Sequence, residues 1–190
     1  LAVVAVPATV FILAILFAVQ SRGTNTIGKI FGPVTFVWFT LIGSLGIYRI
    51  LQHPEVLKAL SPTYAFQYFL NHGLHSVFVL AAVILVVTGA EALYTDMGHF
   101  GAKPIRIAWA IIVGPALVLS YLGQAAVLMN NPAAISNPFF ALAPNKGMTL
   151  VLVIVATAAT IVASQALITG VFSLSRQAVQ LGLFPRLTIR

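Results

Sequence analysis

Glu91 is the first residue whose chemistry stands out, because it is a carboxylate within a long apolar run. The run begins near Leu74 and contains Thr88-Gly89-Ala90-Glu91. A charged side chain at the bilayer centre costs about 2.5–3.5 kcal/mol on insertion scales, so such residues face a cavity or a protein interior. A cation or proton site is one interpretation, and a structural carboxylate bonded to a neighbouring helix is the alternative.

Thr88 lies three residues before Glu91, so the two side chains share one face of a helix. Gly89 between them indicates either close packing or a local break in that helix. A break would free backbone carbonyls, and broken helices near the bilayer midplane form the ion sites of many transporters. The pattern therefore favours a monovalent cation held by neutral oxygens and one charge. A transition metal is disfavoured, because no second carboxylate or cysteine lies nearby in the sequence.

Tyr94, Asp96 and His99 follow at the end of the same run. Histidine can titrate near neutral pH, so one hypothesis gives these residues a role in proton relay or gating. The alternative is helix termination at Gly98, with Asp96 paired to a basic residue that follows it.

The composition of the chain indicates a membrane protein. Of its 190 residues, 60% are apolar and 7% are charged, and the mean hydropathy is +1.04. Soluble domains carry about 25% charged residues, so a soluble enzyme, a disordered tail and a nucleic-acid module are all disfavoured. The basic residues are scattered between apolar runs, and the chain has no cysteine. No hydrolytic motif is visible, so we expect neither an enzyme nor a bound cofactor.

Five apolar stretches are long enough to cross a bilayer as helices. They are residues 1–20, 31–51, 74–97, 105–129 and 148–175. The chain opens within the first of these, and we expect it to be a fragment of a longer membrane protein. The fold class expected from the residues is an all-α integral membrane bundle with several spans.

Residues 54–72 join the second and third stretches and are rich in Tyr and Phe in their second half. Pro54 suits the first turn of a short helix, and aromatic side chains favour the headgroup depth of a bilayer. This segment is predicted to be helical and to lie in the membrane interface. An ordered extracellular loop is the alternative.

The fifth stretch is rich in small residues, which let helices pack closely. Its polar side chains include Ser164, Gln165 and Thr169. Close packing is the simpler interpretation, and a polar lining for a pathway is the other.

The residues around Glu91 resemble a hallmark of the Kup (KUP/HAK/KT) potassium uptake transporters, in their bacterial form. The resemblance rests on the stretch from Thr88 to Tyr94 and on Asp96-Met97-Gly98-His99-Phe100-Gly101. Further stretches agree and extend over nearly the whole chain: Phe31-Gly32-Pro33, Asn71-His72-Gly73, Pro104-Ile105-Arg106, Gly123-Gln124, Asn137-Pro138-Phe139-Phe140, Ala163-Ser164-Gln165-Ala166 and Ser175-Arg176-Gln177-Ala178.

This resemblance implies a LeuT-like (APC superfamily) inverted-repeat transporter of about twelve spans, of which the chain covers spans four to eight. It implies potassium uptake together with protons across the cell inner membrane. Thr88 and Glu91 would then lie in the broken sixth helix and contribute to potassium binding. The expected partners are the lipid bilayer, potassium and the rest of the chain, and a homodimer is left open. No nucleic-acid partner is expected.

Three rival functions remain at this point. A pore-type channel is disfavoured because the sequence lacks a Thr-Val-Gly-Tyr-Gly filter. An amino-acid transporter of the same fold would offer backbone and aromatics to an organic substrate where this chain has a carboxylate. The third rival is a membrane protein in which Glu91 is purely structural.

The distribution of basic residues generates a prediction about topology. Alternating spans place seven Lys and Arg on one side and three on the other, and the richer side is expected to be cytoplasmic. Single cysteines at Thr24 and Ala102, in a full-length protein freed of other cysteines, should resist an impermeant thiol reagent applied from outside. Labelling of both positions from outside would reject the assignment.

Overall fold

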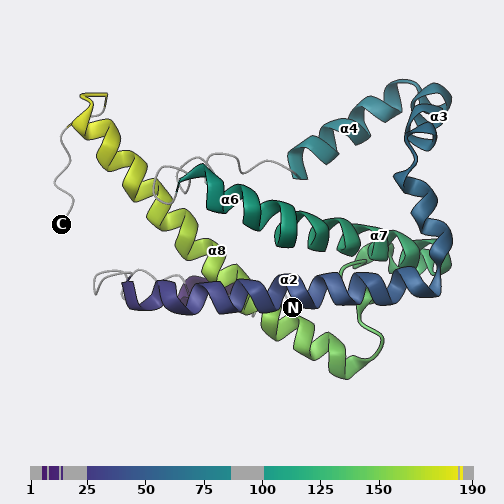
Figure 1. The fold of residues 1–190 in the computed structure, drawn as a ribbon, viewed down its shortest axis with the longest axis horizontal. Helices are drawn as coiled ribbons and strands as arrows, with labels where there is room; N and C mark the ends of the chain where they lie inside the picture. The colour runs from purple at the N-terminus through teal and green to yellow at the C-terminus, as the bar shows by residue number, and fades with distance from the viewer. Residues whose placement is uncertain are drawn as a thin grey trace. The chain divides into compact units, whose positions relative to one another are not determined.

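The structure is a computed structural model that describes residues 6–7, 9–12, 14, 25–86, 101–183 and 185. These residues form α-helices, 3-10 and π-helical turns and connecting loops, with no strand among them (Figure 1). The chain divides into two compact units. The first combines Leu1–Trp38 with Val153–Arg190, and the second is Phe39–Leu152. Helices α2 (Asn25–Gln52) and α8 (Lys146–Gln180) each pass from one unit into the other.

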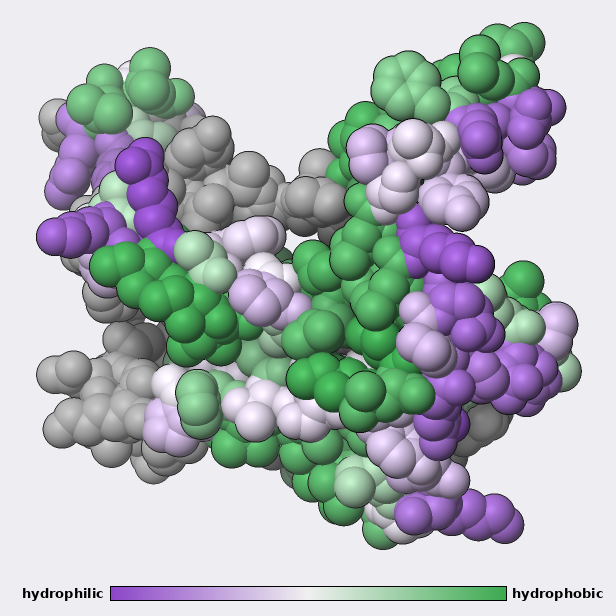
Figure 2. Space-filling model, turned by 45° about the vertical axis from the view of Figure 1, so that its right-hand side comes forward, coloured by the Kyte–Doolittle hydropathy of each residue, from purple (hydrophilic) through white to green (hydrophobic). Residues whose placement is uncertain are grey.

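Three helical stretches in the described residues are long and apolar enough to cross a bilayer. They are Phe31–Gln52 with 22 residues, Ala102–Asn130 with 29 and Lys146–Gln180 with 35. Each exceeds the roughly 20 residues that a span needs. Hydrophobic residues also cover much of the face drawn in Figure 2. The chain is therefore a helical integral membrane protein, as its composition predicts, and the part of it that the structure describes contains no strand.

The helices reach beyond the apolar stretches read from the sequence. α2 begins at Asn25, where the apolar stretch was predicted from residue 31, and α8 continues to Gln180, beyond the predicted end at 175. Hydropathy marks only the part of a helix that suits hydrocarbon, whereas the hydrogen-bonded helix can continue into the interface. The predicted stretch 1–20 lies largely outside the described residues, as does the second half of 74–97.

The stretch predicted at 105–129 is one helical segment with a local irregularity. It consists of α6 (Ala102–Ala108), a π-helical turn η2 (Trp109–Val113) and α7 (Gly114–Asn130). Pro115 in the first turn of α7 has no N–H to donate, and its ring crowds the preceding turn. The N–H of Gly114 instead bonds the carbonyl of Trp109, five residues back. The wider turn thus accommodates the proline without ending the helix.

In the second unit, the C-terminal part of α2 crosses α7 at glycine residues. A β carbon on Gly46 would clash with the carbonyl oxygen of Leu119 and lie 2.8 Å from the nitrogen of Ser120. A β carbon on Gly123 would lie 2.6 Å from the α carbon of Gly46. The two backbones are therefore in direct contact, which the absence of both side chains makes possible.

The segment after α2 folds against α7. The 3-10 helix η1 (Pro54–Leu60) buries Val56, which is 3% exposed, in a cluster with Ile50 and Ala126. Leu119, Leu122 and Ala125 pack against this cluster. The helix predicted to begin near Pro54 is therefore present, in a tighter 3-10 form, and one hydrophobic residue anchors it.

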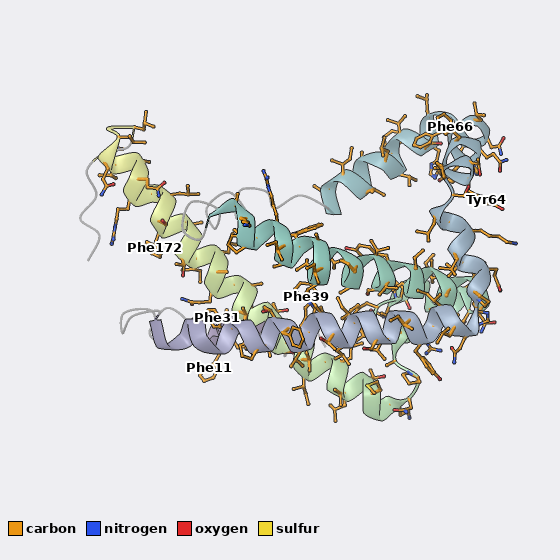
Figure 3. All side chains as sticks on the ribbon, viewed as in Figure 1. Phe11, Phe31, Phe39, Tyr64, Phe66 and Phe172 are labelled. Atoms are coloured by element: carbon orange, nitrogen blue, oxygen red, sulfur yellow. The ribbon has the colours of Figure 1, made fainter. Side chains whose placement is uncertain are left out.

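Helix α3 (Pro62–His72) follows, and a tight turn connects it to α4 (Leu74–Val86). Gly73 makes the turn with φ of 50°, a conformation that suits glycine. The hydroxyl of Ser76, which is fully buried, lies 3.4 Å from the carbonyl oxygen of Tyr68. No residue of α3 is buried, and Figure 3 shows Tyr64 and Phe66 on this helix. Its place in the membrane interface stays a prediction.

A loop with two 3-10 turns, η3 (Pro132–Ser136) and η4 (Phe140–Leu142), joins α7 to α8. Leu142 is fully buried, and its side chain would lie 3.1 Å from a β carbon on Gly123. Asn145 then caps α8 through its side-chain oxygen, which accepts a hydrogen bond of 2.8 Å from the N–H of Met148. Leu142 thus fixes the loop to the glycine crossing of α2 and α7.

The glycine crossing can be tested with Gly46→Ala in the full-length protein. The added methyl group meets the backbone of α7, so the helices must separate, and such overpacking typically costs about 1–3 kcal/mol. We expect a lower melting temperature in detergent. The control is Gly32→Ala, because a β carbon at Gly32 meets nothing within 4 Å among the described residues. Equal melting temperatures for the two variants would contradict the proposed contact.

Candidate functional site

The residues predicted to bind potassium or to move protons all fall in one segment. Thr88, Glu91, Tyr94, Asp96 and His99 lie within residues 87–100, which are outside the described residues. The described chain stops at the end of α4 and resumes just before α6. The roles of these five residues therefore stay predictions.

Two histidines of the second unit, His53 and His72, make local contacts. His53 Nδ1 lies 3.7 Å from Glu55 Oε1 on a partly exposed surface. The ring of His72 stacks on Tyr68 with centroids 4.3 Å apart, and its Nδ1 lies 3.0 Å from the carbonyl oxygen of Tyr68. Nowhere in the described part of the chain do three His, Cys, Asp or Glu residues gather in a way that could hold a metal ion.

Arg49, in the last turn of α2, makes a set of hydrogen bonds that the sequence does not reveal. Its Nε donates to the carbonyl oxygen of Leu142 at 2.9 Å, and its Nη2 donates to those of Ala141 and Ala143, also at 2.9 Å. Its Nη1 donates to Oε1 of Gln52 at 3.0 Å. One guanidinium therefore binds three successive backbone carbonyls of the loop before α8.

This contact suits arginine for two physical reasons. The planar guanidinium offers five N–H donors in a fixed fork, so it can bind several carbonyls at once, which a lysine ammonium cannot match in geometry. A cation in the last turn also interacts favourably with the helix C-terminus. Arg49 further lies 5.6 Å from the ring centroid of Tyr48, within cation–π range.

In the sequence, Arg49 stands out only as one of the basic residues near the end of an apolar stretch. The carbonyls that it binds are 92 to 94 residues away along the chain. One signal was present, because Pro144 follows Ala143 and offers no N–H to the turn. Consecutive carbonyls in such a turn need a donor from elsewhere. The proline does not indicate which residue supplies that donor.

The Arg49 contact can be tested by Arg49→Lys in the full-length protein. Hydrogen bonds to charged groups contribute about 1.5–3 kcal/mol, so we expect amide hydrogens of residues 139–143 to exchange at least about tenfold faster. The control is Lys58→Met, which removes a positive charge from an exposed side chain of η1. Unchanged exchange in the Arg49 variant would show that the carbonyl bonds do not hold the loop.

Comparisons with known proteins agree with one another. A family model described as "K+ potassium transporter integral membrane domain" matches residues 1–190. A protein of Xylella fastidiosa (strain Temecula1) named "Probable potassium transport system protein Kup" is 55% identical over 97% of this chain and 29% of its own length. A Paramagnetospirillum magneticum protein named "Probable potassium transport system protein Kup 2" is 56% identical over 97% of this chain and 28% of its own.

A third relative, from Xanthomonas campestris pv. campestris (strain 8004), is 52% identical over 97% of this chain. No solved structure matches the chain. The chain spans only 28% to 29% of the length of these three relatives. Since the family model matches the whole chain, the chain belongs to the Kup family of potassium transporters, as the motif around Glu91 predicts.

Proposed function

We propose that the full-length protein imports potassium across the cell inner membrane, in symport with protons and by alternating access. In this proposal it is a multi-pass protein with a LeuT-like inverted-repeat core, and the chain supplies spans four to eight. The observation that carries the proposal is the match of the potassium transporter domain to residues 1–190. The names of the relatives, which describe potassium transport system proteins, support it.

The position of Thr88 and Glu91 in the sequence supports a site within the membrane. They are two and five positions after Val86, inside the predicted stretch 74–97, which is long enough to cross a bilayer.

In the proposed mechanism, Thr88 supplies a neutral oxygen and Glu91 supplies the charge that potassium needs. Glu91 must alternate between charged and neutral forms, so that cation and proton can occupy the site in turn. Tyr94, Asp96 and His99 would form the relay or gate on the cytoplasmic side. The remaining ligands would come from spans outside this chain.

The decisive experiment is Glu91→Gln in the full-length protein. The change keeps the size of the side chain and removes its charge, so we expect loss of potassium-dependent growth and uptake in cells without their own potassium uptake. Thr88→Val should raise the half-saturating potassium concentration by a smaller factor of about three to ten, since it removes one neutral ligand. Uptake is measured with a potassium or rubidium tracer at limiting concentration.

The matched control is Glu55→Gln, which neutralises an exposed carboxylate of η1 and should leave uptake unchanged. Near-normal uptake by the Glu91 variant would make this carboxylate structural. Wild-type uptake that does not respond to a proton gradient would favour a channel, and uptake of an amino acid in place of potassium would favour the other transporter type.

A further inference from the structure

Gln165 is a buried amide for which the described chain provides no partner. It is 2% exposed, and among the described residues neither its Oε1 nor its Nε2 has a hydrogen-bond partner. It is the twentieth of the 35 residues of α8, so it lies near the middle of a helix that can cross the bilayer. An amide buried without hydrogen bonds is costly, and in hydrocarbon no water is available to satisfy it. Such a group requires an explanation.

Thr169 places a second neutral oxygen one turn further along α8. Residues four apart lie on the same face of a helix. The hydroxyl of Thr169 donates to the backbone carbonyl oxygen of Gln165 at 2.9 Å. The hydroxyl proton is therefore used in a hydrogen bond within the helix, while the lone pairs of the hydroxyl oxygen can still accept. Thr169 is exposed among the described residues, whereas Gln165 is buried, and both side-chain oxygens belong to one face of α8 and can accept further bonds.

Other hydroxyls on α8 differ from this pair in one respect. Thr157 and Thr160 also donate to carbonyls four residues back, at 2.8 Å each. Thr160 lies about 140° round the helix from Gln165 at 100° per residue, and no buried amide without a partner accompanies it in the described part of α8. The combination of an unsatisfied amide with a neighbouring hydroxyl oxygen is therefore confined to one face.

We propose that Gln165 and Thr169 form a neutral-oxygen contact for potassium, separate from Thr88 and Glu91. The inference rests on the proposed function, since it requires potassium to pass through the protein. A hard monovalent cation is stabilised by amide and hydroxyl oxygens in place of its water shell. The amide Nε2 donates to a water that the ion retains. Because the pair carries no charge, potassium binds weakly there and can leave again, as a pathway requires.

The first test is Gln165→Met, which keeps the length of the side chain and removes both polar atoms. In full-length protein reconstituted into liposomes, we expect the half-saturating potassium concentration to rise by about tenfold. We also expect the stabilisation of the purified protein by potassium, measured as a shift of the melting temperature, to shrink. Thr169→Val should raise the half-saturating concentration by about threefold.

Gln165→Asn provides a second readout in case the methionine variant does not fold. It keeps an amide but withdraws its oxygen by one methylene, so the site should favour the larger ions. We expect the ratio of rubidium to potassium uptake to increase. The matched control is Thr160→Val, which removes a hydroxyl from another face of α8 and should change neither affinity nor ion preference.

Two results would overturn the inference in distinguishable ways. In the first, the wild type takes up potassium, and the Gln165 variants have the wild-type affinity and rubidium-to-potassium ratio. The amide would then serve only to join α8 to other spans, whether or not the melting temperature falls. If the wild type takes up no potassium and potassium does not stabilise it, the proposed function fails and the inference fails with it.

Discussion

The direct contact between the backbones of α2 and α7 is the interaction on which the second unit depends. In lipid, apolar surface gives helices little reason to associate, so close packing has to hold them together. Gly46 and Gly123 make this possible, because a side chain on either would clash with the other helix. Val56 packs into the cluster formed by the two helices, and Leu142 covers Gly123. The positions of η1 and of the loop before α8 therefore depend on the close approach of α2 and α7 that Gly46 and Gly123 allow.

A second constraint is that polar groups within a membrane protein must be satisfied from inside the protein. Arg49 satisfies its donors with three loop carbonyls and the Gln52 amide oxygen, and the buried Ser76 hydroxyl reaches the Tyr68 carbonyl. Even the threonines of α8 donate to carbonyls one turn back. Gln165 departs from this pattern among the described residues. A group that breaks a rule its neighbours follow is a better candidate for function than for support.

Sequence reasoning predicted the kind of protein, the family and the apolar stretches, because hydropathy and a specific motif carry that information locally. It could not predict the π-helical turn before Pro115, since the pattern of hydropathy is the same with or without a wider turn. It also missed the role of Arg49, whose partners are more than 90 residues away in the sequence. It noted Gln165 as polar, but its burial depends on tertiary packing. The Thr88 and Glu91 pair was predicted from sequence and lies outside the described residues.

The polar groups in the described part of the chain separate into those that hold the structure and those that, under the proposed function, remain free to bind an ion. Arg49 cannot serve a cation, because its positive charge repels potassium and its donors already bind carbonyls. An oxygen whose lone pairs already accept hydrogen bonds within the protein must break those bonds before it binds an ion, which makes it a costly ligand. A carrier must bind its ion and release it again, so its ligands should have free lone pairs and a stiff surrounding frame. The glycine crossing and the Arg49 contact hold the second unit together, and the residues that form them are not available to bind an ion. Under the proposed function, potassium must then be bound by the oxygens that are not used in this way.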